Sequence, residues 1–100
     1  MRNYRISVRA DGDIAGIADY TIKTFGIAQA RLYRVGLEDS FQLLADDPTK
    51  GKSAEEFAPN LRRWNYKSHA IFFVPEQAGI LVVRVLHLQM DFRRHPMTVD

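Results

Sequence analysis

Apolar and polar positions follow first a two-residue period and then a helical period along the first half of the chain. Residues 4–8 alternate apolar and polar side chains, which predicts a half-buried strand. Apolar residues then recur every three or four positions, which predicts one amphipathic helix from an N-cap at Asp11 to Gly26 and a second from about Ala28 to Ala45. Little more than Gly26 joins the two helices, so we expect an antiparallel hairpin.

The second half contains three short apolar runs separated by turn-forming residues. The runs Leu61–Tyr66, Ala70–Val74 and Ile80–Leu86 are rich in Val, Ile, Phe and Trp, and consecutive antiparallel pairing is the simplest arrangement for them. Residues 49–60 read as a loop, and residues 89–100 as a short polar C-terminal tail. The predicted fold class is therefore α+β, with the order β-α-α-β-β-β and a helical hairpin packed on one face of a mainly antiparallel sheet.

Length and composition limit the kinds of protein that this chain can be. One hundred residues with 46% apolar and 26% charged side chains suit one globular domain, residues 1–100, and exclude a disordered or low-complexity protein. With no cysteine, the chain has no disulfide and no thiolate nucleophile or metal ligand. No apolar run approaches a membrane span, and the first ten residues do not resemble a secretory signal. We therefore expect a cytoplasmic protein without a membrane association.

Basic residues are concentrated in one part of the second half. Residues 60–75 include Arg62, Arg63, Lys67 and His69 but no acid, although the net charge of the whole chain is only +2. A basic face of this kind suits an anionic partner, but cations on the solvent side of strands explain the same pattern. The sequence is compatible with both interpretations.

The sequence contains no motif for phosphate binding, nucleophilic catalysis or metal binding. It has no glycine-rich phosphate loop and no nucleophile elbow. His87, Asp91 and His95 are four residues apart, which would align them on a helix, but His87 ends a strand and Pro96 limits any helix beyond it. We therefore expect no metal and no cofactor.

Several local motifs together are similar to the ParE branch of the ParE/RelE toxin superfamily, which is encoded in bacterial toxin–antitoxin operons. The similarity covers nearly the whole chain, from the strand Ile6–Ala10 to the tail Met90–His95. It is sharpest in Asn60–Arg63, His69–Phe73 and Ile80–His87. The resemblance implies a non-enzymatic toxin that inhibits DNA gyrase by direct binding and is neutralised by a ParD-type antitoxin in a hetero-oligomer. It also implies that nucleic acid is reached only through the antitoxin.

The alternative within the same superfamily is a RelE-like, ribosome-dependent mRNA endoribonuclease. Such a reaction needs a base, an acid and cations around the phosphorane. His87 and the neighbouring basic residues supply a base and positive charge, but these enzymes often place a Tyr near the C-terminus, and no Tyr follows Tyr66 here. The non-catalytic toxin is therefore the preferred interpretation.

Two protein-binding surfaces are predicted. The two helices carry more apolar residues than one sheet face can cover, so we expect an antitoxin-binding groove. Its predicted residues are Ile14, Ile17, Tyr20, Leu32, Tyr33 and Val35. A cationic patch at the end of the sheet is expected to bind the target, and its predicted residues are Arg62, Arg63, Arg84, His87, Arg93 and Arg94.

Alternation along strands restricts which of these basic side chains share a surface. Arg62 and Arg63 are adjacent and therefore point to opposite faces, and Arg84 and His87 do so too unless a bulge intervenes. Arg84 has a second interpretation, because an ion pair with Glu38, Asp39 or another acid would tie a helix to the sheet.

Overall fold

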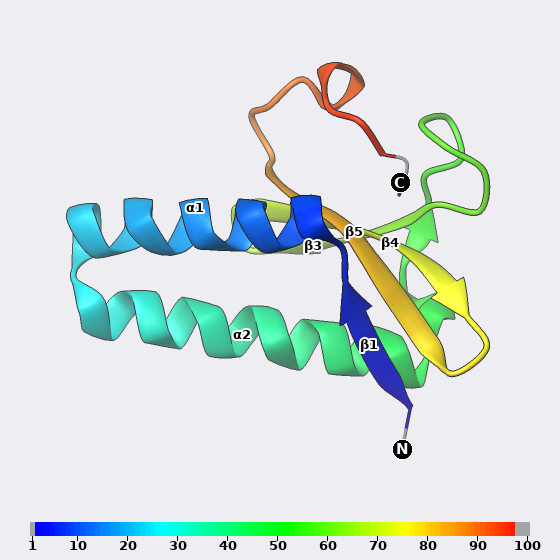
Figure 1. The fold of residues 1–100 in the computed structure, drawn as a ribbon, viewed down its shortest axis with the longest axis horizontal. Coiled ribbons are helices and arrows are strands. Elements are labelled where there is room, and N and C mark those ends of the chain that lie inside the picture. The colour runs from blue at the N-terminus through cyan, green and yellow to red at the C-terminus, as the bar shows by residue number, and fades with distance from the viewer. Residues whose placement is uncertain (1, 98–100) are drawn as a thin grey trace.

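A computed structural model describes residues 2–97 and contains two long helices and a five-stranded sheet. In chain order the elements are β1 (Asn3–Ile6), α1 (Val8–Phe25), α2 (Ile27–Asp46), the 3₁₀ turn η1 (Pro48–Lys50), β2 (Lys52–Ser53), β3 (Arg62–Tyr66), β4 (His69–Glu76), β5 (Gly79–His87) and the 3₁₀ turn η2 (Phe92–Arg94). Figure 1 shows the antiparallel helical hairpin, with α2 on the opposite side of the sheet from the C-terminal tail. The expected α+β fold is confirmed.

The sheet is mixed, with one parallel pair among antiparallel neighbours. Its strand order is β1-β5-β4-β3-β2; β1 pairs in parallel with β5, and the other neighbours are antiparallel. The connection between the parallel strands β1 and β5 consists of the helical hairpin followed by β2, β3 and β4. The two-residue strand β2 lies inside the segment that we predicted to be a loop, because two residues are too short to give a periodic signal.

The N-cap of helix α1 lies four residues earlier than the predicted N-cap at Asp11. Ser7 is the true N-cap, and its Oγ accepts a hydrogen bond from the backbone nitrogen of Ala10 at 3.0 Å. Val8, which extended the predicted strand by its apolar character, is instead in the first turn of the helix and is 90% exposed. The alternation of apolar and polar residues therefore placed the end of the strand at Val8 instead of Ile6. Val8 is apolar, but it contributes nothing to the core.

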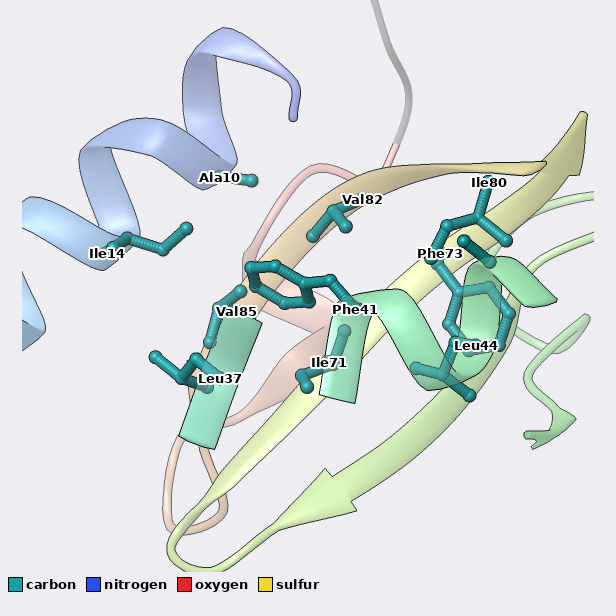
Figure 2. Close-up of a cluster of buried hydrophobic side chains, with 11 residues drawn as sticks. Ala10, Ile14, Leu37, Phe41, Leu44, Ile71, Phe73, Ile80, Val82 and Val85 are labelled. Carbon is teal, nitrogen blue, oxygen red and sulfur yellow. The ribbon is translucent and has the colours of Figure 1, made fainter. Parts of the chain in front are cut away.

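The main core lies between the helices and one face of the sheet. Figure 2 shows Leu37, Phe41 and Leu44 of α2 and Ile14 of α1 directed toward side chains of the strands. The cluster consists of Ala10, Ile14, Leu37, Phe41, Leu44, Ala45, Ile71, Phe73, Ile80, Val82 and Val85. Burial of a large aliphatic or aromatic side chain contributes about 1.5–3 kcal/mol, so this layer fixes the hairpin on the sheet.

A second, smaller core covers the opposite face of the sheet. Ala70 and Phe72 alternate with the main-core residues of β4 and pack against the segment 54–61 and the tail. The prediction of a merely polar tail is wrong, because the tail packs on this core. The ring centroid of Phe92 lies 5.0 Å from that of Phe72, and Met97 is buried. Isolated apolar residues in a polar segment give no periodic signal. Positions 1 and 98–100 of the predicted domain and tail lie outside the described residues.

Neither helix of the described chain is long and apolar enough to cross a membrane.

Candidate protein-binding surfaces

A groove of about 910 Å³ opens between α1, the start of α2 and the end of the sheet. Ile17 and Tyr20 line it from α1, Tyr33 lines it from α2, and Lys67 and His87 lie at its sheet end. Most of this surface is apolar or aromatic, and a small cluster of polar groups lies at the sheet end. A concave, largely apolar surface with a few polar groups is typical of a binding site.

The structure brings together only part of the predicted antitoxin-binding groove. Ile17, Tyr20 and Tyr33 line the observed groove, whereas Ile14 is 2% exposed and belongs to the main core. Leu32 and Val35 are exposed on α2 but do not line the groove. Residues adjacent on a helix are about 100° apart around its axis, so Leu32 cannot share the orientation of Tyr33.

Two histidines and a tyrosine form the polar cluster at the sheet end of the groove. The strand register pairs His69 with His87, and their ring centroids are 5.2 Å apart. The Tyr33 hydroxyl is 2.6 Å from His69 Nδ1. Burial, reinforced by the neighbouring His87, lowers the pKa of His69 to about 4. Burial also raises the pKa of Tyr33, so both side chains are neutral near pH 7.

His69 is the part of this cluster that sequence reasoning missed. In the sequence, its basic side chain places it only in the basic segment of residues 60–75. Its closeness to His87 depends on the register of the β4–β5 hairpin, and its contact with Tyr33 joins residues 36 positions apart. One sequence signal was available: His69 directly precedes one predicted strand and His87 directly follows the end of the next, so a hairpin of the two strands would place them side by side.

The helix glycines have different roles around the groove. A Cβ placed on Gly36 would lie 1.7 Å from the hydroxyl oxygen of Tyr66, so this glycine allows α2 to approach β3. Gly12 and Gly16 line the groove instead, and a Cβ on either would meet nothing within 4 Å. At these two positions the α1 wall of the groove therefore carries no side chain, beside Ile17 and Tyr20.

Arg84 of the predicted target-binding patch is held in an ion pair. Its Nε and Nη2 each donate to a carboxylate oxygen of Asp13 at 2.8 Å, and the two side chains are only 11% and 14% exposed. Asp13 also accepts from the backbone nitrogen of Val85 at 3.0 Å, where β5 extends beyond the end of β1. The hydrogen bond to Asp13 raises the pKa of Arg84. The helix-to-sheet alternative is therefore correct, although its acid is Asp13 and not Glu38 or Asp39.

Arg62 and Arg63 point to opposite faces, as the strand alternation predicts. Arg62 donates from Nε to the Pro48 carbonyl at 3.1 Å and from Nη2 to the Gly51 carbonyl, so it organises the turn before β2. Arg63 lies on the other face, with its guanidinium 5.2 Å from the centroid of the Phe92 ring. Arg63 is available as part of a surface, whereas Arg62 is engaged by the backbone.

The remaining predicted basic residues occupy two different places. Arg93 and Arg94 are exposed in η2 directly after Phe92, and Arg94 is 3.5 Å from Asp91. Together with Arg63 they form what we call the tail cluster: Arg63, Phe92, Arg93 and Arg94. His87 instead lines the groove. The single predicted patch is thus divided between the tail cluster, the groove and two structurally engaged arginines.

Within residues 2–97, no group of three or more histidine, aspartate or glutamate side chains is arranged to hold a metal ion.

Comparison with known proteins gives consistent matches over nearly the whole chain. Residues 4–92 match the family model described as "ParE toxin of type II toxin-antitoxin system, parDE". Toxin ParE1 of Caulobacter vibrioides is 33% identical over 95% of this chain and 98% of its own length. Toxin ParE of Escherichia coli is 37% identical over 91% of this chain and 89% of its own length.

A solved structure has the same fold. A chain of the "Chromosomal ParDE TA system from P. aeruginosa" matches with a TM-score of 0.75 and 15% identity, over 89% of this chain and 98% of that chain. The arrangement of a two-helix hairpin on a mixed sheet in the present chain therefore has a counterpart in a solved structure.

Proposed function

Because the chain belongs to the ParE toxin family of type II toxin–antitoxin systems, we propose that it inhibits DNA gyrase by direct contact in the cytoplasm. We further propose that a ParD-type antitoxin binds and neutralises it. The observation that carries the proposal is the family match over residues 4–92. Members of this family act without catalysis, in agreement with the prediction that the chain is not an enzyme.

The groove is the proposed antitoxin site. Its apolar lining includes Ile17 and Tyr20 of α1 and Tyr33 of α2, and no segment of the described chain fills it. Tyr20 is 64% exposed, so a partner that covered it would remove a large aromatic surface from water. That burial would contribute about 1.5–3 kcal/mol to binding. Gly12 and Gly16 leave room for the partner's backbone to approach α1 closely.

The tail cluster is the proposed contact surface for gyrase. It combines an aromatic ring with three arginines, the types of residue that dominate binding energy in protein interfaces. It lies on the face of the sheet opposite the main core, whereas the groove is formed by the helices and one end of the sheet. Two distinct surfaces allow the antitoxin and gyrase contacts to be disturbed separately.

Substitutions in the two surfaces test this proposal in cells and in binding assays. Tyr20→Asp is expected to weaken antitoxin binding at least tenfold in titration calorimetry and to leave growth inhibition by the toxin alone unchanged. Leu32→Asp is the matched control, because it adds the same charge to an equally exposed apolar residue outside the groove. The double variant Arg93→Ala with Arg94→Ala is expected to reduce growth inhibition and to keep antitoxin affinity.

Two outcomes would contradict the assignment of the surfaces. Equal antitoxin affinity of the Tyr20→Asp and Leu32→Asp proteins would remove the groove as the antitoxin site. Full growth inhibition by the double arginine variant, expressed at the same level as the parent chain, would remove η2 from the gyrase contact.

A further inference from the structure

The sheet end of the groove offers positive charge and hydrogen-bond donors that lack an acidic partner. Lys67 is exposed on the two-residue turn between β3 and β4, and its amine is 5.6 Å from the centroid of the Tyr66 ring. No carboxylate of the described residues forms an ion pair with Lys67. Asp13 also lines the groove, but both of its oxygens are bonded to Arg84. The carboxylate of Asp13 is therefore neutralised by Arg84, whereas the charge of Lys67 has no acidic partner among the described residues.

His87 adds a donor to the same end of the groove. Its Nδ1 accepts a hydrogen bond from the backbone nitrogen of Gln89 at 3.1 Å, so in the neutral ring the proton is on Nε2. His69 next to it is already in contact with the Tyr33 hydroxyl. Lys67 and the Nε2–H of His87 are thus donors for which the described part of the chain supplies no acceptor.

The backbone at Lys67 is in the left-handed region, with φ of 48°. Gly, Asn and Asp are preferred at such positions in two-residue hairpin turns, so a lysine is unfavourable there. The turn is nevertheless fixed at the groove, because the Ser68 carbonyl accepts from the backbone nitrogen of Leu88 at 2.9 Å. The lysine is held beside the groove by the two strand ends.

From these contacts we propose that the antitoxin segment in the groove is amphipathic and carries a carboxylate that binds Lys67 and His87. The inference rests on the proposed function and specifies the chemistry of the partner at that site. Apolar side chains of the segment cover Ile17, Tyr20 and Tyr33, and an Asp or Glu lies at the sheet end. A charge-assisted hydrogen bond in a partly enclosed groove fixes the register of the segment as well as adding affinity.

Charge reversal at Lys67 tests the inference with the purified chain and its cognate antitoxin. The Lys67→Glu protein is expected to bind the antitoxin at least tenfold more weakly in titration calorimetry. The Lys50→Glu protein carries the same change on the exposed turn η1, away from the groove, and is expected to bind within twofold of the parent. Thermal unfolding of both variants is measured as a control, and each is expected to show a cooperative transition like that of the parent. One Asp→Lys or Glu→Lys substitution in the antitoxin is expected to restore binding to the Lys67→Glu protein.

Each other outcome overturns a defined part of the account. If Lys67→Glu and Lys50→Glu bind equally well while Tyr20→Asp binds weakly, the carboxylate contact is wrong and the groove remains the antitoxin site. If Tyr20→Asp also binds normally, the proposed site itself is wrong. If Lys67→Glu abolishes growth inhibition without the antitoxin and keeps antitoxin affinity, the lysine contacts gyrase and the inference is overturned.

Discussion

The three glycines within the helices show how the surroundings of one residue decide its contribution to stability. In a helix interior, Gly is about 1 kcal/mol less favourable than Ala, so each glycine weakens its helix unless its small size is needed. Gly36 is needed, because the Tyr66 hydroxyl occupies the space of a Cβ. Gly16 meets no atom of its own chain within that space.

Alanine substitutions at these two glycines are expected to act in opposite directions. Gly36→Ala forces the Tyr66 ring to move and should lower the free energy of unfolding by about 1–3 kcal/mol. Gly16→Ala should raise it by up to about 1 kcal/mol. Urea unfolding followed by circular dichroism measures both values. Equal effects of the two substitutions would contradict the packing described for Gly36.

The depressed pKa of His69 makes stability depend on pH in a defined interval. The unfolded chain binds a proton at this imidazole near its ordinary pKa of 6.5, whereas the folded chain does so only at about 4. Protonation therefore favours unfolding, and stability contributed by the neutral ring is lost as the pH falls from 6.5 toward 4. We expect the melting temperature to fall between pH 7 and pH 5, and the fall to be smaller in the His69→Asn protein. His95→Asn is the control, and an equal fall in all three proteins would refute the assignment.

At the scale of elements, α1 is attached to the sheet through polar groups as well as through the core. Ser7 and Asp13 bond the backbone of β5 at Val83 and Val85, beyond the point where β1 ends, and Asp13 also holds Arg84. These bonds satisfy backbone groups at a strand edge that would otherwise lack partners. The ion pair therefore joins a helix to a strand and is a structural contact.

Removal of either partner of this ion pair is expected to destabilise the fold. Arg84→Ala and Asp13→Ala should each lower the free energy of unfolding by about 3 kcal/mol, because each leaves a largely buried charge unpaired. The double variant should lose less than the sum of the two, as a double-mutant cycle in urea would show. Small, additive losses would mean that the arginine is free, as the patch hypothesis required.

Periodicity predicted the elements well, and it failed where an element depends on a single contact. Both helices and the strands β3, β4 and β5 follow repeated patterns, and their predicted positions agree with the structure to within a few residues. The start of α1 depends on one cap at Ser7, and the docked tail depends on a few isolated contacts, such as those of Phe92 and Met97. A pattern averaged over a segment does not contain information of that kind.

The candidate site was less predictable than the fold, because it depends on contacts between distant residues. Helical spacing assigned Ile14 and Ile17 to one stripe, but only the packing shows that Ile14 is buried and Ile17 lines the groove. The partner of Arg84 lies 71 positions earlier in the chain, at Asp13. Sequence patterns define which residues are suitable for a surface, whereas strand register and helix packing decide which of them meet.

At the scale of the whole molecule, we propose that this ParE-family toxin has two separate binding surfaces. The central proposal is that the chain stops gyrase by contact. In this proposal the antitoxin binds in the groove, so it does not compete with gyrase for direct contact with the tail cluster. A large partner that fills the groove can still block gyrase by its bulk, because the toxin has a radius of gyration of only 13.0 Å.

A supercoiling assay with purified gyrase tests that claim most directly. The chain alone is expected to inhibit supercoiling of relaxed plasmid or to trap cleaved DNA, and prior addition of the antitoxin is expected to abolish the effect. The Arg93→Ala with Arg94→Ala protein serves as the control for the tail cluster and is expected to inhibit less. Normal supercoiling in the presence of the chain, together with ribosome-dependent cuts in mRNA, would contradict the account and place the protein with the RelE-like nucleases.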